Sequence, residues 1–308
     1  MKDFFYTVTG QDEGLTVERL LKKLGFTGKE ISRQKFIPRG ISLDGAQCRV
    51  TKTVCEGQKL KLVFESEKQA CKNQPELKKQ DFPEILYEDE DLLVVNKPGG
   101  LSSHRGRGHY LDNLGTRIQC MLASKGKCDS IVREIGRLDR DTSGLMIFAK
   151  NRISAARLSR QRQEGRLEKT YYALVWGSFL QKTGEICFPL KEADGVKNRM
   201  TVSKQGKEAV TCYQAVHTGV LCGKEISLVR CRLKTGRTHQ IRVHMAASGH
   251  SVVGDSFYGT VSEDEKFSLC LHAGSIRFLQ PFTGKEICVT VRPDSWPLEW
   301  EEETWQNG

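Results

Sequence analysis

The 308-residue sequence lacks the signatures of the common nucleotide cofactors and of membrane insertion. It contains neither a phosphate-binding P-loop nor a GxGxxG motif after a strand-like segment, and no apolar run approaches the length that spans a bilayer. The first residues, MKDFFYTVTGQDEG, contain no apolar core of the kind found in signal peptides. We therefore expect a cytoplasmic protein that acts without a membrane.

The sequence also lacks paired cysteines, although it contains 11 cysteines in total. No CxxC motif occurs, the number is odd, and single cysteines are scattered through strand-like segments. This pattern predicts reduced and mostly buried thiols. No metal site is expected, because His239 and His244 are five residues apart and no cysteine pair accompanies them.

Acidic residues are missing or rare in the most basic segments of the chain, whose formal net charge is +10. Residues 230–244 carry five basic side chains and no acid, and residues 150–170 carry seven basic and two acidic side chains. The segment 294–308 reverses the sign, with five acids and no base. Clustering of this kind indicates a surface that binds a polyanion. A solvated helix face would explain the segment 150–166 about as well.

The order of predicted elements divides the chain into four parts. Residues 1–65 form a small module of two short helices and short strands, with a hairpin signal at Asp44-Gly45. Residues 66–81 are polar and without periodicity, which is typical of a linker. Over residues 82–294 strands dominate, and helices are interspersed without regular alternation, which favours an α+β fold with a mixed, mainly antiparallel sheet. Residues 295–308 are an acidic tail.

Within the larger part, the pattern predicts helices over 151–164 and 238–248. Strands are predicted over 145–150, 170–176, 211–216, 226–233, 269–272 and 287–291, with two more inside 84–98. The apolar run Leu145–Ala149 is short enough for a strand that is buried on both faces. The charged stretch IGRLDRDTSG before it is therefore expected to be a loop held by a rigid scaffold.

Four ordered segments carry a family resemblance. They are VVNKPGGLSSH (94–104), GRLDRDTSGLMIFAK (136–150), EKTYYALVWG (168–177) and LKTGRTHQIRVHMAASGHSVVGDSFYG (233–259). In this order they resemble the motifs of the RluA-type pseudouridine synthases, over essentially all of residues 82–293. Residues 15–64 resemble an S4-type RNA-binding module, which often precedes the catalytic domain in this family. The resemblance implies an isomerase that converts uridine in RNA to pseudouridine, with no cofactor and no metal.

One position departs from the family pattern. The aspartate motif of RluA-type enzymes usually begins with histidine, whereas this chain has Gly136. A Gly-Arg-Leu-Asp opening is more similar to the sister RsuA group, which also carries an S4 module. The segments KTYYALVWG and TGRTHQIRVHM are similar to the RluA group. We therefore predict an RluA-like enzyme with Gly136 as a local variant, and an RsuA-type synthase stays as the alternative.

The resemblance identifies Asp139 as the catalytic carboxylate. Isomerisation of uridine breaks the C1′–N1 bond, turns the base and joins C5 to C1′, so it is redox-neutral and consumes no water. A carboxylate beside C1′ can attack that carbon or support positive charge on the sugar. Whether Asp139 attacks C1′ or removes a proton from C2′ stays open. The family match nominates Arg242 as its ion-pair partner, and the alternative for Arg242 is a solvated basic helix.

Tyr171 matches the active-site tyrosine of the family, two residues after Lys169. Its ring can stack on an everted base and its hydroxyl can assist proton removal at C5, whereas core packing is the alternative. Tyr172 points to the opposite face of a strand, and we assign it to the core. Arg137 resembles the arginine that helps to evert the target base, with a surface ion pair to Asp141 as the alternative.

Several cationic side chains are expected to contact RNA. Two of them lie in the glycine-rich loop 96–110, for which a flexible surface loop is the alternative. The predicted RNA-contacting residues are Arg137, Arg105, Arg107, Lys169, Arg237 and His239. Lys97 is left out of the predicted site, because the matching family segment mainly shapes the floor of the catalytic domain.

The sequence thus predicts a monomeric RNA pseudouridine synthase that acts on structured RNA, with ribosomal RNA as the first choice and transfer RNA as the second. A catalytically silent RNA-binding or ribosome-assembly factor is the main alternative, and Gly136 is the one feature in its favour. The presence of Asp139, Tyr171 and Arg242 argues against it. A nucleoside hydrolase is a second alternative, which would release free uracil.

Overall fold

The computed structural model describes residues 2–64, 77–78, 81–104, 112–126, 131–196, 199–259, 267–294 and 296–297. The chain separates into two compact units, Met1–Lys72 with Lys125–Ile131, and Asn73–Ser124 with Val132–Gly308. The predicted linker over 66–81 and the predicted acidic tail over 295–308 fall almost entirely outside the described residues.

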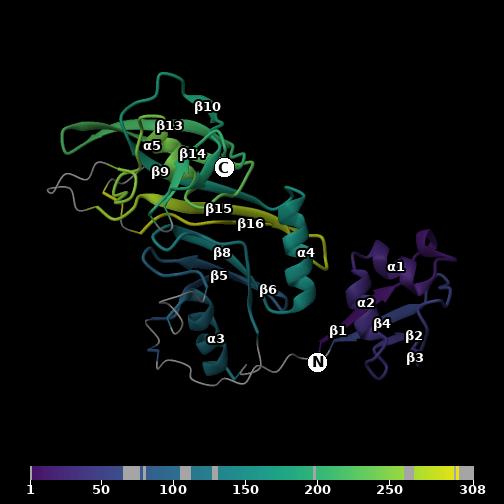
Figure 1. Cartoon of the computed structure of the whole chain (residues 1–308). Helices are drawn as coiled ribbons and strands as arrows, with labels where there is room; N and C mark the ends of the chain where they lie inside the picture. The colour runs from purple at the N-terminus through teal and green to yellow at the C-terminus, as the bar shows by residue number, and fades with distance from the viewer. Residues whose placement is uncertain are drawn as a thin grey trace. The chain divides into compact units, whose positions relative to one another are not determined.

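The first unit is a four-stranded antiparallel sheet with two short helices (Figure 1). The strand order is β1-β4-β2-β3. Its elements are β1 (Lys2–Thr7), η1 (Gly10–Asp12), α1 (Val17–Lys23), α2 (Gly28–Gln34), β2 (Ile41–Leu43), β3 (Ala46–Gln47) and β4 (Lys59–Phe64). Asp44 and Gly45, both with positive φ, join β2 to β3 and confirm the predicted hairpin.

Local sequence explains where the two helices of this unit begin. Thr16 accepts a hydrogen bond from the backbone N–H of Arg19 at the start of α1, and Thr27 forms a capping box with Glu30 at the start of α2. Apolar side chains at helical spacing, such as Leu20 and Ile31, are buried together with the inward side chains of β4. The helices therefore cover the sheet and form its core.

The second unit is built on a ten-stranded mixed sheet (Figure 1). Its main strand order is β10-β13-β14-β9-β15-β8-β6-β5, with β16 beside β15 and β7 beside β8. The pair β8–β15 is parallel, and the other described pairs are antiparallel. The predicted α+β class is thereby confirmed, because helices pack on a mixed sheet without regular alternation.

The elements of the second unit are β5 (Glu84–Glu88), β6 (Leu92–Lys97), α3 (Leu114–Ser124), β7 (Arg133–Ile135), β8 (Ser143–Ala149), α4 (Arg152–Gln163), β9 (Glu168–Trp176), β10 (Thr183–Ile186), β11 (Leu190–Glu192), β12 (Met200–Val202), β13 (Thr211–Leu221), β14 (Lys224–Leu233), α5 (Gln240–Ala247), β15 (Leu271–Leu279) and β16 (Glu286–Thr290). The strands β11 and β12 form a separate antiparallel pair.

Strand β8 lies in the middle of the core. Met146 and Phe148 pack with residues of α3 on one face of the sheet, and Leu145 and Ile147 pack with residues of α4 on the other. All four side chains are fully buried, which confirms the prediction of a strand covered on both faces. Burial of each such side chain contributes about 1.5–3 kcal/mol. The loop that precedes β8 is therefore attached to the buried centre of the sheet.

The chain enters β8 through a glycine that no other residue could replace without a shift of backbone. Gly144 has a φ of 109°, and a Cβ there would lie 2.4 Å from the carbonyl oxygen of Ala273 on the parallel strand β15. Ser143 Oγ is 2.8 Å from His272 Nδ1 on the same neighbouring strand. The start of β8 is thus tied closely to β15.

The nine cysteines within the described residues are all free thiols. Only Cys231 and Cys270 are buried, so the prediction that most of the thiols are buried is wrong. Strand alternation exposes others, as it does Cys288 on β16. Across the described ranges, no cluster of three or more His, Cys, Asp or Glu side chains could hold a metal ion, and no helix is long and apolar enough to cross a bilayer.

Candidate active site

Asp139 lies in the loop between β7 and β8. The residue before it is fixed, because Leu138 is buried and Ser103 Oγ both donates to its carbonyl at 2.6 Å and accepts its N–H at 3.2 Å. Thr142 closes a turn by donating its N–H to the carbonyl of Asp139 at 3.2 Å. The Asp139 side chain is half-buried, and no described residue donates a hydrogen bond to its carboxylate. Its backbone is therefore held in place while its carboxylate oxygens stay available.

Lys97 holds the residue on the other side of Asp139. This side chain is fully buried at the end of β6. Its Nζ donates to the carbonyl oxygens of Pro98, Leu101 and Arg140, at 2.8–2.9 Å. Burial lowers the pKa of the Lys97 ammonium to about 7, and the nearby charges of Asp141 and Asp139 oppose that shift. Lys97 thus positions the Asp139 loop, although the sequence analysis left it out of the site.

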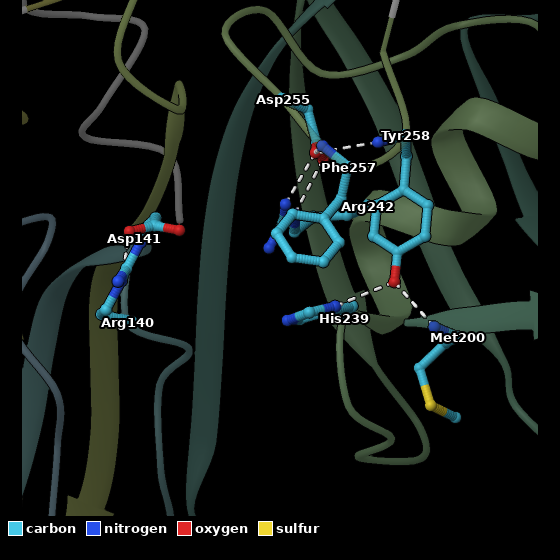
Figure 2. Close-up of polar contacts among 8 residues, drawn as sticks. All are labelled: Arg140, Asp141, Met200, His239, Arg242, Asp255, Phe257 and Tyr258. Atoms are coloured by element: carbon cyan, nitrogen blue, oxygen red, sulfur yellow. Dashed lines mark hydrogen bonds and ion pairs between the residues drawn. The ribbon is translucent and has the colours of Figure 1, made fainter. Parts of the chain in front are cut away.

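Two neighbouring charged residues of the loop pair with each other. Arg140 Nε and Asp141 Oδ1 form an ion pair at 3.0 Å, which is substantially exposed (Figure 2). The alternative interpretation of Arg137 as the partner of Asp141 is therefore wrong, because Arg140 takes that place. Arg137 is exposed, and its charge is among those that lower the pKa of His239.

Tyr171 lies in β9 between strands β14 and β15. Its ring is partly buried and packs against two of the core clusters of the sheet. Burial raises the pKa of the phenol, the charge of Asp139 raises it further, and the charge of Arg162 opposes the shift. Tyr171 is therefore neutral at physiological pH and within electrostatic range of Asp139. Tyr172 is 1% exposed on the other face of the strand, which confirms its assignment to the core.

Arg242, on α5, forms its ion pair with Asp255. Nε donates to Oδ2 at 2.7 Å and Nη2 donates to Oδ1 at 2.6 Å, and both side chains are almost completely buried (Figure 2). The predicted ion pair between Arg242 and Asp139 is therefore wrong. Backbone N–H groups of Phe257 and Tyr258 already fix the Asp255 carboxylate, so it presents a ready planar acceptor to the guanidinium.

The charge of Asp139 nevertheless reaches Arg242. Burial works against the Arg242 charge, but the hydrogen bonds and charge of Asp255, together with Asp139 and Tyr258, raise the pKa of the guanidinium. Asp139, Tyr171 and Arg242 are thus brought into one electrostatic environment, without a direct bond between Asp139 and Arg242. Arg242 can stabilise a charged Asp139 through space rather than by holding it.

Two aromatic rings and a histidine complete the Arg242 side of the site (Figure 2). The guanidinium carbon is 5.4 Å from the centre of the Phe257 ring and 5.2 Å from that of Tyr258. Tyr258 Oη accepts the N–H of Met200 at 2.9 Å and lies 2.8 Å from His239 Nδ1. His239 precedes α5 in the left-handed conformation, with a φ of 52°. Burial lowers its pKa, and the charge of Asp139 opposes that shift.

The other predicted RNA-contacting residues are placed as follows. Lys169 donates from Nζ to the carbonyl of Leu145 at 3.1 Å, and burial, assisted by the charge of Arg162, lowers its pKa to about 8. Arg237 is exposed and donates from Nε to the carbonyl of Glu208 at 2.9 Å. Arg105 and Arg107 lie outside the described residues.

Sequence reasoning missed three members of this site. Asp255 and Tyr258 stand inside the quoted segment GDSFYG, so the signal was present, but their partners could not be chosen from the sequence. Lys97 was assigned to the floor of the domain, because the matching family segment mainly has that role. All three act by holding other groups in place.

Comparison with known proteins decides the family. The model of the RNA pseudouridylate synthase family matches residues 91–247, a stretch that contains Asp139, Tyr171 and Arg242. The chain belongs to the RNA pseudouridylate synthase family. The predicted RluA-type family and the predicted isomerase activity are thereby confirmed.

Named relatives are similar over most of the chain. The ribosomal large subunit pseudouridine synthase D of Zymomonas mobilis is 37% identical over 223 residues, covering 68% of this chain and 68% of its own. The tRNA pseudouridine synthase C of Haemophilus ducreyi is 34% identical over 238 residues, covering 72% of this chain and 96% of its own. Among solved structures, the human RNA pseudouridylate synthase domain containing 1 is 28% identical with a TM-score of 0.59, covering 72% of this chain and 88% of that one.

Proposed function

We propose that this synthase isomerises uridine in ribosomal RNA and that Asp139 is its catalytic carboxylate. One observation carries the assignment. The Asp139 backbone is held on both sides, through Ser103 and Lys97, while no described residue donates a hydrogen bond to its carboxylate. An acid placed in this way can meet a reacting sugar carbon without first breaking bonds to the protein.

The reaction needs one bond broken and one bond made at the same sugar carbon. The C1′–N1 bond breaks, the base turns, C5 bonds to C1′, C5 loses its proton and N1 gains one, so the product is an isomer of the substrate. Asp139 either attacks C1′ or removes a proton from C2′, and both routes begin from a carboxylate that is ionised.

Tyr171 and Arg137 would act on the base rather than on the sugar. The neutral phenol of Tyr171 offers a ring face for an everted uracil, beside Asp139. Arg137 is exposed on the same loop, and its guanidinium would enter the space that the everted base leaves in the RNA stack. Opening the stack costs a few kcal/mol, which an inserted guanidinium offsets in part.

Two named relatives differ in the RNA that their names give, since one is a ribosomal large subunit pseudouridine synthase and the other is a tRNA pseudouridine synthase. We assign the first unit of this chain, with its two helices and four-stranded sheet, as an S4-type RNA-binding module. Such a module suits a large structured RNA, which favours ribosomal RNA. The exposed Arg237, with His239 in the same segment, would add contacts at the catalytic unit.

The decisive experiment maps pseudouridines in total RNA from cells with and without this chain. Loss of a pseudouridine from ribosomal RNA supports the proposal, and loss from transfer RNA alone overturns the substrate class. The purified protein is then incubated with ribosomal RNA that carries tritium at C5 of uridine. No tritium release from any cellular RNA would make the chain a binding factor, and free uracil as product would make it a hydrolase.

A further inference from the structure

Arg162 connects two loops of the site that are far apart in the sequence. It lies in the last turn of α4. A Cβ on Gly136, in the Asp139 loop, would lie 3.5 Å from the Cζ and Nε of Arg162. A Cβ on Gly236, in the loop before α5, would lie 3.9 Å from its Nη2. The guanidinium therefore rests against two positions that carry no side chain.

The charge of Arg162 reaches the reacting part of the site. It opposes the rise in the pKa of Tyr171 that burial and Asp139 produce. It also helps burial to lower the pKa of Lys169. Since both of these residues lie on β9, the guanidinium lies close to the strand that carries the active-site tyrosine. It belongs to the active-site surroundings rather than to a remote surface.

Arg162 differs from the neighbouring arginines in having no acidic partner. Arg160 Nε donates to Glu164 Oε1 at 2.7 Å, and Arg166 Nε donates to Glu164 Oε2 at 2.9 Å. The Arg162 side chain is exposed, and it forms no hydrogen bond or ion pair with any described residue. Its donors are therefore free to bind an anion.

We propose that Arg162 is a substrate-binding residue that holds an RNA backbone phosphate next to the everted uridine. The inference rests on the proposed function, and adds a contact from α4 to it. A guanidinium presents a planar set of donors that matches two phosphate oxygens. Gly136 and Gly236 leave room for the guanidinium to lie against both loops of the site. The phosphate contact fixes the nucleotide beside Asp139 and Tyr171.

Three variants of the full chain test the proposal. Arg162→Gln removes the charge, Arg162→Lys keeps the charge but not the planar donor pair, and Arg160→Gln is the matched control on the same helix. Bulk ribosomal RNA from cells that lack this chain is the probe, and binding is measured between roughly 50 and 200 mM salt. Tritium release from C5-labelled RNA gives kcat/KM.

Loss of one phosphate contact has a defined signature. Arg162→Gln should lower kcat/KM about tenfold and reduce the slope of log Kd against log salt concentration by about 0.7–1. Arg162→Lys should keep the wild-type slope and recover part of kcat/KM. Arg160→Gln should stay within about twofold of wild type in kcat/KM, because its side chain pairs with Glu164.

Two results would overturn the proposal. One is a wild-type salt slope for Arg162→Gln, and the other is an equal loss for Arg160→Gln, which would mean a general basic surface. If wild-type protein releases no tritium, the proposed function fails, and the salt slopes still decide whether Arg162 binds a phosphate. Thermal unfolding of each variant shows that the fold is kept.

Discussion

Asp139 and Asp255 are two aspartates of one site in opposite situations. Asp255 is fully buried and accepts four hydrogen bonds, two from the Arg242 guanidinium and two from backbone N–H groups. Asp139 is half-buried, and its carboxylate receives no hydrogen bond from the described part of the chain. A carboxylate with four donors is a structural group, because any new bond must displace an existing one. A residue whose backbone is held in place, but whose carboxylate accepts no hydrogen bond, is suited to react.

The difference also shows that Arg242 interacts with the two aspartates in different ways. Arg242 donates two hydrogen bonds to Asp255, and its guanidinium lies near the rings of Phe257 and Tyr258. It acts on Asp139 only through its charge. Charge fixed in advance in a partly buried site stabilises a charged state without rearrangement. The Asp139 side of the site is positioned instead by Lys97 and Ser103, which bind backbone carbonyls of its loop.

The largest effect on stability should come from removing the negative charge of Asp255. Asp255→Asn leaves the Arg242 charge buried and uncompensated, and we expect the free energy of unfolding to fall by about 3–5 kcal/mol. The described tryptophans, Trp176 and Trp296, pack in the second unit, so urea denaturation followed by tryptophan fluorescence reports on that unit. Asp141→Asn is the control, since its ion pair is exposed, and it should change stability by less than about 1 kcal/mol. Equal effects of the two variants on stability would contradict the distinction between the buried ion pair of Asp255 and the exposed ion pair of Asp141.

A smaller loss should follow when the support of the Asp139 loop is removed. Lys97→Met keeps a side chain of similar length but removes the donor to three backbone carbonyl oxygens, those of Pro98, Leu101 and Arg140. The free energy of unfolding should fall by about 2–3 kcal/mol, and tritium release should slow by at least about tenfold as Asp139 loses its position. Arg140→Gln provides the comparison for an exposed side chain of the same loop. Wild-type release by Lys97→Met would show that the loop needs no such support.

The smallest expected effect for any single step of the measurement is the dependence of stability on pH. The pKa of Lys97 is about 7 in the folded protein and about 10.5 in the unfolded chain, so the unfolded chain binds more protons between these values. The free energy of unfolding due to Lys97 should therefore rise with pH from about 7 to 10.5, by at most about 1.4 kcal/mol per pH unit. Urea denaturation across that range measures it. The difference between wild type and Lys97→Met isolates this group, and a flat difference would contradict the assignment.

Much of the framework could be predicted from the sequence. The apolar run of β8 identified a doubly buried strand, and the change from apolar to charged residues located the Asp139 loop. The helix α3 was missed, although Leu114, Ile118, Met121 and Leu122 stand at helical spacing. The acidic partner of Arg242 was predicted wrongly as Asp139, because Asp139 and Asp255 both stand in family motifs and only tertiary geometry shows which carboxylate faces the guanidinium. The surroundings of Arg162 could likewise not be predicted, because α4, the Asp139 loop and the loop before α5 are separate in the sequence and meet only in the folded chain.

The most direct test of this account measures Asp139→Asn in two ways at once. The account predicts that tritium release from C5-labelled RNA falls by at least about a thousandfold, since the reacting group is gone. It also predicts that the free energy of unfolding stays within about 1 kcal/mol of wild type, because no described residue donates a hydrogen bond to that carboxylate. A variant that unfolds as readily as Asp255→Asn, or one that still releases tritium at the wild-type rate, would contradict it.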